Sequence, residues 1–325
     1  MSAATDVSLG DPQAFEELAR IYRRELHVHC YRMLGSVLDA EDLVQETFLR
    51  AWRSRASYLH HASPRTWLYR IATNTCLSAL THRSRRRLPE DLRAPIDEVA
   101  WLEPYPDTLL DGIADDAPGP EALYDQREAT ELAFVAALQH LAPRQRAVLL
   151  MRDVLGFSVA EVADQLASSA AAVSSAHQRA RATLEQRFPE GLPARPRLTP
   201  SVQRLLDRYV SSWERGDLDA LVALLSEDVV LSMLPLPEWF SGRQSVRAFF
   251  EWAWGPAGPG PFRLVSIGAN AQPAFGLYGW AADANAFTPQ AIQVLTLERD
   301  RIARVHGFVR PDLFTVFGLP LRLPA

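Results

Sequence analysis

Four side chains of the segment 39–52 recur at a spacing that places them on one helix face: Asp42, Gln45, Glu46 and Leu49. The opposite face is apolar, so these four are expected to be exposed. A leucine surrounded by carboxylates suits a basic helical partner, because charge orients the partner and the apolar centre contributes affinity. Most charged helix faces are only solvated, and on this segment alone that interpretation stays open.

Histidine and cysteine side chains raise the question of a metal site, since His27, His29 and Cys30 lie close in sequence and His60 precedes His61. Ligands two residues apart on a helix point in different directions, and no second cluster is spaced to complete a tetrahedral site. We therefore expect structural or surface roles for these residues, and neither a metal nor a cofactor.

The elements that must position the acidic face are predicted from periodicity and helix caps. Residues 11–88 show apolar positions at helical spacing. Asp39 is expected to cap the helix that carries the acidic face, and Pro64 to occupy the first position of the next helix.

A helix-turn-helix pattern lies further along the chain. Ser158 and Glu161 form a capping box that opens a short helix. A tight turn at 167–169 then leads to a longer helix over 170–188. Such a motif places its second helix in the major groove of DNA.

Charge is unevenly distributed, although the net charge is only −5. Residues 89–125 carry eleven acidic residues, one Arg and several prolines, which predicts a linker rather than long helices. The helical segments on either side are weakly basic, so separate modules are expected. A solvated tether is one interpretation of this acidic linker.

The remaining chain changes pattern after a second proline-rich linker. Helices are expected at 200–215 and 218–225, followed by strands at 262–270, 272–280, 290–298 and 301–309. Helices followed by strands predict an α+β domain.

Composition limits the class of protein. The length of 325 residues suggests two or three domains, and 48% hydrophobic residues excludes wholesale disorder. No apolar run is long enough to span a membrane, and two cysteines cannot build a disulfide framework, so a cytoplasmic protein is expected.

Two sequence words carry a resemblance to a known family: Asp39-Ala-Glu-Asp-Leu-Val-Gln-Glu-Thr-Phe-Leu-Arg-Ala-Trp52 and Thr66-Trp-Leu-Tyr-Arg-Ile-Ala-Thr-Asn74. They occur in this order, and the helix-turn-helix follows them. Residues 11–188 thereby resemble the sigma-70 family of bacterial transcription initiation factors, in its extracytoplasmic-function (ECF) group. The resemblance implies two partners, core RNA polymerase (through its β′ clamp and β flap) and promoter DNA.

The resemblance also implies three sets of site residues. The helix 39–52 would bind the β′ clamp through Asp39, Glu41, Asp42, Leu43, Gln45, Glu46 and Leu49. The next segment would melt and bind the minus-ten element through Tyr58, Trp67, Arg70, Ile71, Asn74, Arg83, Arg85, Arg86 and Arg87. The helix-turn-helix would bind the minus-thirty-five element through Arg152, Ala171, Ala172, Ser174, Ser175, His177, Gln178, Arg179 and Arg181.

Physical roles differ within these sets. Asn74 supplies both a donor and an acceptor for a base edge, whereas the arginines from Arg83 onward would contact phosphates, which adds affinity without sequence information. Ser174 stands where the family often has a basic residue, so this module is expected to bind DNA more weakly and with less salt dependence. The acidic linker would thread the polymerase channel that later holds RNA.

Residues 199–325 resemble a SnoaL-like domain, a cone-shaped α+β barrel, on words such as Leu205-Leu-Asp-Arg-Tyr-Val-Ser-Ser-Trp213 and Trp239-Phe-Ser-Gly-Arg-Gln-Ser-Val-Arg247. This fold usually encloses an apolar pocket, and some members use acid–base pairs there. His306 with Asp228 or Asp283 is the candidate pair, and a core position for His306 is the alternative. The candidate pocket residues are Tyr209, Trp213, Met233, Trp239, Trp252 and His306.

The expected fold class is multidomain: two all-α sigma modules, the second a helix-turn-helix, followed by an α+β SnoaL-like cone-shaped barrel. The expected layout is sigma domain two at 11–88, an acidic linker at 89–120, sigma domain four at 121–188, a linker at 189–198 and a regulatory domain at 199–325. The expected function is promoter-specific initiation without catalysis, tuned by contacts of the last domain with the sigma modules. The alternative is a DNA-binding module fused to a SnoaL-like domain that senses a small ligand or acts as an isomerase or cyclase.

Overall fold

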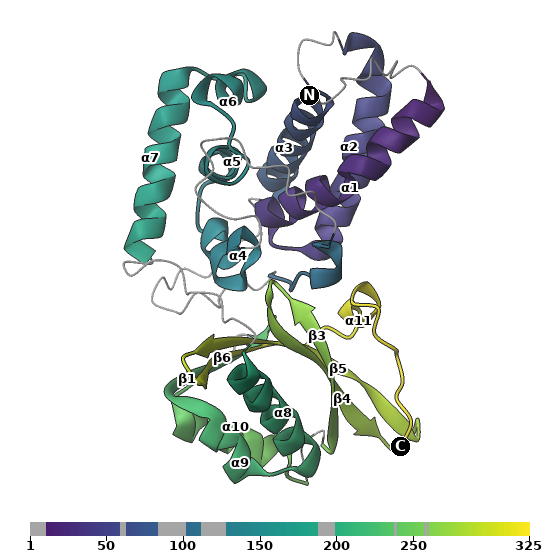
Figure 1. The fold of residues 1–325 in the computed structure, drawn as a ribbon, viewed down its shortest axis with the longest axis vertical. Helices are drawn as coiled ribbons and strands as arrows, with labels where there is room; N and C mark the ends of the chain where they lie inside the picture. Colours follow the sequence, from purple (N-terminus) through teal and green to yellow (C-terminus); the bar gives the residue numbers. More distant parts are fainter. Residues whose placement is uncertain are drawn as a thin grey trace. The chain divides into compact units, whose positions relative to one another are not determined.

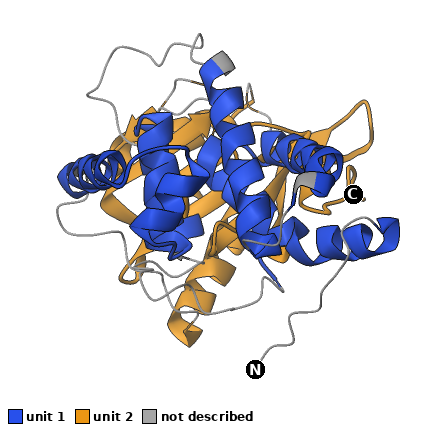
Figure 2. Ribbon diagram, turned by 90° about the horizontal axis from the view of Figure 1, so that it is seen from above, with its two compact units in different colours: residues 1–90, 110–130, 134–191 blue, residues 91–109, 131–133, 192–325 orange. Residues whose placement is uncertain are grey.

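The computed structural model describes residues 11–58, 63–83, 102–111, 128–187, 199–236, 239–256, 258 and 260–325. The chain divides into two compact units (Figure 2), the first formed by residues 1–90, 110–130 and 134–191 and the second by residues 91–109, 131–133 and 192–325. Both helical modules expected from the sequence lie in the first unit. Residues 102–109 of the acidic linker, in contrast, belong to the C-terminal unit.

Three long helices open the first unit (Figure 1): α1 (Pro12–Leu34), α2 (Val37–Ser54) and α3 (Pro64–Arg83). A 3-10 turn, η1 (Arg55–Ser57), follows α2. Pro64 occupies the first position of α3, as predicted. The prediction that Asp39 caps α2 is wrong. The cap is Ser36, whose hydroxyl accepts a hydrogen bond from the backbone N–H of Asp39 at 3.1 Å. The helix begins earlier because Gly35 ends α1 in a left-handed conformation, which places Ser36 at the cap.

The second helical module consists of α4 (Leu132–Gln139), α5 (Pro143–Leu149), α6 (Val159–Gln165) and α7 (Ala170–Arg187). A 3-10 turn, η4 (Glu128–Thr130), precedes α4. α5 does not continue as a regular α-helix but is followed by a π-helical segment, η5 (Leu150–Val154). The predicted capping box is confirmed: Ser158 N–H donates to Glu161 Oε2 at 2.7 Å, and Glu161 N–H donates to Ser158 Oγ at 3.2 Å. Helices α6 and α7 with the turn between them confirm the helix-turn-helix.

The two helical modules pack against each other inside the first unit. The Phe157 ring lies 6.0 Å from the Tyr69 ring, and the Arg65 guanidinium carbon lies 6.0 Å from the Phe157 ring centroid. From α5, Arg146 donates a hydrogen bond to the backbone oxygen of Met33 at the end of α1. The helix-turn-helix module is therefore anchored on α1 and α3.

The C-terminal unit confirms the expected α+β class. Its helices are α8 (Pro200–Arg215), α9 (Leu218–Leu224), α10 (Arg243–Ala253) and α11 (Leu313–Val316). Its strands are β1 (Leu225–Leu234), β2 (Trp239–Ser241), β3 (Phe262–Ala269), β4 (Gln272–Ala281), β5 (Ala286–Glu298) and β6 (Arg301–Phe308). They form one sheet in the order β2-β1-β6-β5-β4-β3, in which β1 and β6 are parallel and the other pairs antiparallel.

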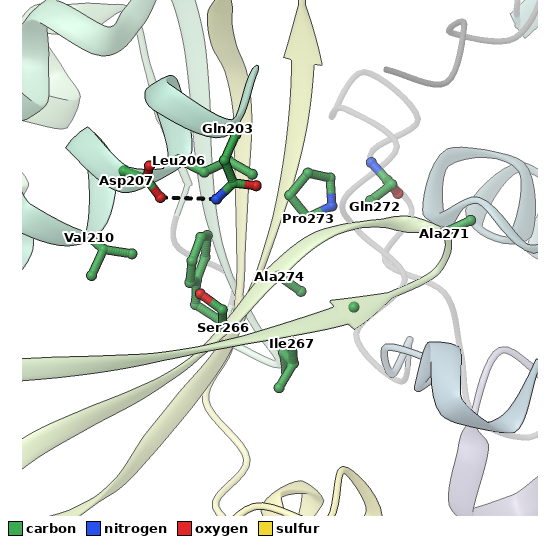
Figure 3. Close-up of a pocket in the computed structure, with 12 residues that line it drawn as sticks. Gln203, Leu206, Asp207, Val210, Ser266, Ile267, Ala271, Gln272, Pro273 and Ala274 are labelled. Carbon is green, nitrogen blue, oxygen red and sulfur yellow. Dashed lines mark hydrogen bonds between the residues drawn. The ribbon is translucent and has the colours of Figure 1, made fainter. Parts of the chain in front are cut away.

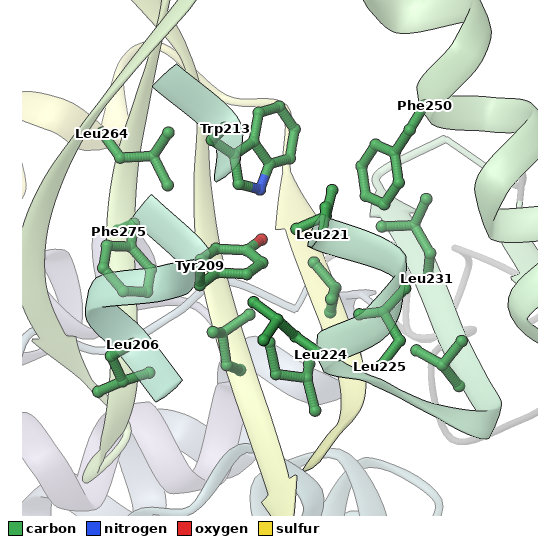
Figure 4. Packing of buried hydrophobic residues seen from close by; sticks show 14 of the residues in the cluster. Leu206, Tyr209, Trp213, Leu221, Leu224, Leu225, Leu231, Phe250, Leu264 and Phe275 are labelled. Atoms are coloured by element: carbon green, nitrogen blue, oxygen red, sulfur yellow. The ribbon is translucent and has the colours of Figure 1, made fainter. Parts of the chain in front are cut away.

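Helices α8, α9 and α10 cover one face of this sheet, and aromatic side chains fill the space between them (Figure 4). The Trp213 ring centroid lies 5.2 Å from that of Phe250 and 5.2 Å from that of Phe262. The Tyr209 hydroxyl donates to Gln293 Oε1 at 2.9 Å, and burial raises the pKa of Tyr209. Packed side chains thus fill the space between these helices and the sheet.

Candidate functional site

Helix α2 presents one continuous exposed stripe. Asp42, Gln45 and Leu49 are exposed, Leu49 by 51%, and Glu46 is half-buried between them. One turn earlier, Leu38 is 37% exposed and extends the stripe. Leu38 was not among the predicted residues, although its i, i+4 spacing to Asp42 indicates the same helix face.

Arginines next to this stripe compensate part of its negative charge. Glu46 Oε1 accepts a hydrogen bond from Arg50 Nε at 2.6 Å. Glu41 accepts hydrogen bonds from Arg23 and, at 3.0 Å, from Gln45 Nε2. Such exposed ion pairs are weak and can be exchanged for a partner's cations. The half-buried margins of the face are formed by Asp39 and Leu43.

Helix α3 carries a second candidate surface, at the spacing i, i+3, i+4 and i+7 that defines one helix face. Arg70 and Asn74 are exposed there, and Trp67 and Ile71 are half-buried. The Tyr58 ring, just after η1, lies 5.0 Å from the Trp67 ring with an angle of 42° between their planes. An aromatic surface beside an amide offers what an unstacked base requires, a ring to stack on and a hydrogen-bonding edge.

This surface of α3 touches the helix-turn-helix module in the described structure. Asn74 Nδ2 donates to the backbone oxygen of Gln165 at 3.3 Å, at the end of α6. Arg70 Nη1 lies 3.8 Å from Asp164 Oδ2. Two members of the predicted minus-ten set, Arg70 and Asn74, therefore contact α6.

Helix α7 exposes most of the residues predicted to face the minus-thirty-five element. Val173 and Ala180 are buried, as expected for its inner side. Arg179 Nη1 donates to Ser175 Oγ at 2.6 Å, which holds the guanidinium along the helix. The exposed members of the predicted set are Ala171, Ala172, Gln178, Arg179 and Arg181, and the half-buried members are Ser174 and Ser175.

Two further members of that predicted set, Arg152 and His177, make contacts within the module. Arg152 is half-buried, and its Nη1 donates to the backbone oxygen of Phe157 at 2.6 Å. His177 Nε2 lies 2.7 Å from Asp153 Oδ1, a carboxylate that is itself buried. These side chains hold the turn before α6 and the packing of α7 on η5. Both contacts depend on the π-helical segment, which the sequence pattern did not indicate.

Several of the predicted phosphate-contacting arginines follow the end of α3. Arg85, Arg86 and Arg87 lie outside the described residues, and so do His60 and His61. Arg83 is the last residue of α3, and its side chain also lies outside the described part.

The aromatic residues predicted to line a pocket in the C-terminal unit do not meet in one cavity. Tyr209 and Trp213 are buried in the core, whereas Trp239 and Trp252 are 47% and 55% exposed. Trp239 lies on the edge strand β2 and Trp252 on α10. The prediction of a shared pocket is wrong because strand β2 and helix α10 were not expected from the sequence.

The proposed acid–base pair is not supported by the placement of its members. His306 is buried, and its Nδ1 lies 3.1 Å from Ser232 Oγ on the neighbouring strand β1. Asp228 and Asp283 are both exposed. The core interpretation of His306 therefore holds, and the half-buried Met233 lies beside it along β1.

A hollow of about 210 Å³ lies between α8 and the β3–β4 hairpin (Figure 3). Gln203 Nε2 donates to Asp207 Oδ1 at 2.9 Å on its α8 side, and Ser266 lines it from β3. Its volume is below the range of about 300–1,000 Å³ that is typical of small-molecule sites. None of the six predicted pocket residues lines it.

The described part of the chain bears on the expectations that no metal is bound and that no membrane is spanned. There, no group of three or more His, Cys, Asp or Glu side chains is arranged to hold a metal ion. His29 Nε2 lies 2.9 Å from Thr73 Oγ1, and Cys30 contacts Cys76 in the core, a contact that raises the pKa of the Cys30 thiol together with burial. Among the described helices, none has the length and apolar character needed to cross a bilayer.

The buried histidines predict a loss of stability in acid. Burial lowers the pKa of His29 to about 3 and that of His27 to about 4. The unfolded chain takes up these protons near pH 6.5 and the folded chain only near pH 3–4, so the free energy of unfolding falls as the pH drops below about 6.5. We expect His29→Gln to reduce that slope by about 1.4 kcal/mol per pH unit between roughly pH 6 and 4.5, measured by urea unfolding. An unchanged slope would show that His29 is already protonated in the folded protein.

A segment inside the acidic linker is a functional candidate that the sequence analysis missed. Residues 102–106 are buried, so the expectation of a solvated tether is wrong there. The signal available was the short apolar run Trp101-Leu-Glu-Pro-Tyr-Pro106 among the acids. Tyr105 is fully buried, and its backbone pairs with Asn270 in the turn between β3 and β4.

Three family models match this chain, in the order of the modules just described. Sigma-70 region 2 matches residues 18–86, and Sigma-70, region 4 matches residues 131–184. The SnoaL-like domain model matches residues 206–305. The first match spans α1 to α3, the second contains the helix-turn-helix, and the third covers most of the C-terminal unit.

Relatives match along nearly the whole chain. The ECF RNA polymerase sigma factor SigG of Mycobacterium tuberculosis (strain ATCC 25618 / H37Rv) is 46% identical over 313 residues, which cover 92% of this chain and 82% of SigG. The ECF RNA polymerase sigma factor SigJ of the same strain is 29% identical over 318 residues, which cover 92% of each. The crystal structure of the M. tuberculosis extracytoplasmic function sigma factor SigJ is 25% identical with a TM-score of 0.59, covering 94% of this chain and 99% of that chain.

Proposed function

This chain belongs to the ECF group of RNA polymerase sigma factors, and from that premise we propose that the exposed stripe of α2 is the surface that binds the clamp of core RNA polymerase. A sigma factor directs promoter-specific transcription initiation, so it must hold the polymerase and read promoter DNA at the same time. The observation that carries the proposal is Leu49, a large apolar side chain that is 51% exposed among acidic and amide neighbours. A basic helical partner would bury Leu49 and replace the arginines that now pair with Glu46 and Glu41.

We further propose that α3 and α7 read the two promoter elements. Trp67 and Tyr58 would stack an unpaired base of the minus-ten element, and Asn74 would hydrogen-bond to its edge. On α7, the exposed Gln178 would contact base edges, and the exposed Arg179 would contact phosphates.

Reading both elements requires the first unit to open. The two elements are separated by roughly 25 base pairs, or about 85 Å at about 3.4 Å per base pair. Asn74 of α3 and Gln165 of α6 are now 3.3 Å apart, so the modules cannot span that length as they stand. Opening would also break buried contacts between the modules, such as the hydrogen bond from Arg146 to the Met33 oxygen, so the binding of core polymerase must supply the free energy that separates them.

Transcription with purified core polymerase tests this function. We expect Asn74→Ala to lower run-off transcription from promoters used by the wild-type protein by about tenfold or more, the effect of losing about 1.4 kcal/mol of base recognition. Core polymerase binding should not change, because α2 is untouched. Gln13→Ala, which removes an exposed amide from the first turn of α1, should transcribe as the wild-type protein does. Equal transcription by the Asn74 and Gln13 variants would exclude Asn74 from promoter recognition.

The SnoaL-like domain is proposed to be regulatory rather than catalytic. Its interior is filled by Tyr209, Trp213 and their neighbours, and His306 lies beside Ser232 in the core, whereas Asp228 and Asp283 are exposed. These observations favour a domain that acts by contacts with the rest of the chain over a sensor or an isomerase. We propose that the division into sigma domain two, linker, sigma domain four and regulatory domain follows the expected boundaries, and that the protein acts in the cytoplasm, where core polymerase is found.

A further inference from the structure

The turn between β3 and β4 binds part of the acidic linker through paired backbone contacts. Tyr105 N–H donates to Asn270 Oδ1 at 2.9 Å, and Asn270 N–H donates to the backbone oxygen of Tyr105 at 2.8 Å. Ala271 N–H donates to Asp107 Oδ1 at 2.8 Å. Pro106 forms a β-bridge with Ala269, the last residue of β3. The linker therefore extends the edge of the sheet in the manner of an added strand.

Burial and charge complete this contact. Leu102, Glu103 and Tyr105 are 4%, 5% and 0% exposed. The buried Glu103 carboxylate lies 3.2 Å from Arg310 Nη1, just after β6. Burying an ionised carboxylate is costly unless a cation pairs with it, and here Arg310 supplies that cation for Glu103.

The sheet is shaped to receive the linker at this turn. Asn270 and Ala271 both adopt left-handed backbone conformations, with φ of +56°, which aims the Asn270 amide and the Ala271 N–H at the linker. Gly268 leaves space for Asp107, since a Cβ there would come within 2.5 Å of Asp107 Oδ2 and 3.0 Å of its Cγ. β3 is an edge strand of the sheet, and the linker covers the end of that edge.

The same hairpin also contacts the first residue of α4, which lies beyond the linker. Leu132 N–H donates to Gln272 Oε1 at 3.2 Å. Gln272 is buried, and its Nε2 donates to Thr296 Oγ1 at 3.0 Å and to the backbone oxygen of Leu295. The same hairpin thus contacts both residues 105–107 of the linker and the start of α4.

We propose that the β3–β4 turn is a binding site for the linker that joins the two DNA-reading modules, and that linker capture holds the sigma factor inactive until polymerase or another signal releases it. The proposal rests on the proposed function, in which the linker extends through the polymerase when both promoter elements are read. A segment bound to a folded domain through both its backbone and its side chains cannot lie extended in a channel. In the captured state Glu103 is paired with Arg310, so its carboxylate cannot bind basic surfaces of the polymerase.

The test weakens the site without altering the linker. Gly268→Ala places a methyl group against Asp107, and Asn270→Gly keeps the left-handed backbone while removing the acceptor for Tyr105 N–H. Gly307→Ala is the matched control, because its Cβ would meet nothing closer than 3.4 Å. Each full-length variant is examined by hydrogen exchange of residues 102–109 and by run-off transcription with core polymerase.

We expect Gly268→Ala and Asn270→Gly to speed exchange in residues 102–109 by about fivefold or more, as the loss of one hydrogen bond predicts. Transcription should rise several-fold in both variants, while Gly307→Ala behaves as the wild-type protein does. Unchanged exchange in both variants would show that the turn does not hold the linker. Faster exchange with unchanged transcription would overturn the inhibitory role.

Binding of core polymerase, measured alongside, separates this proposal from the proposed function. Gly268→Ala and Asn270→Gly are expected to bind core polymerase at least as tightly as the wild-type protein does, because neither alters α2 and both weaken a contact that competes with the extended linker. If neither the wild-type protein nor any variant binds core polymerase, the proposed function fails first, whatever the exchange rates show.

Discussion

Replacing Arg146 by Met is expected to lower the free energy of unfolding of the helical unit by about 3–5 kcal/mol, the cost of removing a buried charge that donates hydrogen bonds to four acceptors. The Arg146 guanidinium is 4% exposed and donates to the Met33 oxygen, to Gln139 Oε1 at 2.6 Å, to the Gln139 oxygen at 3.0 Å and to the Leu141 oxygen at 3.2 Å. Burial lowers its pKa to about 9, so these acceptors offset a large desolvation cost. Methionine fills similar volume, but it leaves the carbonyl oxygens in a dry site without a donor.

A neighbouring arginine provides the control for this prediction. Arg144 is exposed and makes one hydrogen bond, from Nη2 to the Leu166 oxygen at 2.8 Å. Arg144→Met should cost about 1 kcal/mol or less. Urea unfolding followed by circular dichroism measures both variants. If Arg146→Met stays within about 1 kcal/mol of the wild-type protein, the guanidinium does not join α1 to α4 and α5 as described.

Local signals predicted much of the helical unit because the determinants of its elements are close in sequence. The Ser158–Glu161 capping box, Pro64 at the start of α3 and the stripe from Asp42 to Leu49 are each confirmed. The cap of α2 was missed because the left-handed Gly35 moves the start of the helix back to Ser36.

Residues whose roles depend on distant partners could not be predicted in this way. Arg146 lies in a helical pattern that suggested nothing of its four acceptors. His177 was assigned to DNA because its partner, Asp153, sits in a π-helical segment without a sequence signature.

The C-terminal unit shows the same limit. Strands β3 to β6 were expected, although β5 begins at Ala286 rather than at residue 290, whereas β1, β2 and α10 were not. The sheet pairs β1 with β6 in parallel, a contact between segments about 70 residues apart. Without β2 and α10, Trp239 and Trp252 were assigned to an interior that they do not enter.

The second large effect is expected on α2. We expect Asp42→Arg combined with Glu46→Arg to weaken binding of core RNA polymerase by about 100-fold, equivalent to about 2.7 kcal/mol. Both carboxylates flank the exposed Leu49, so their reversal sets like charges against a basic partner at the point where the apolar contact must form. The free protein should remain folded, because Asp42 is exposed and Glu46 contributes only an exposed pair with Arg50.

A variant with the same change in net charge provides the control. Glu16→Arg combined with Glu17→Arg reverses two exposed acids on α1, away from the α2 stripe. It should bind core polymerase within about threefold of the wild-type protein, since distributed charge acts mainly on the rate of association.

The most direct test is a fluorescence titration of core RNA polymerase with the labelled wild-type protein, the Asp42/Glu46 double variant and the Glu16/Glu17 control at one salt concentration. A dissociation constant about 100-fold higher for the α2 variant alone would show that α2 binds the polymerase. Equal dissociation constants for all three proteins would contradict the assignment of α2 as the surface that binds the polymerase. The proposed promoter recognition, which depends on that complex, would then lose its support.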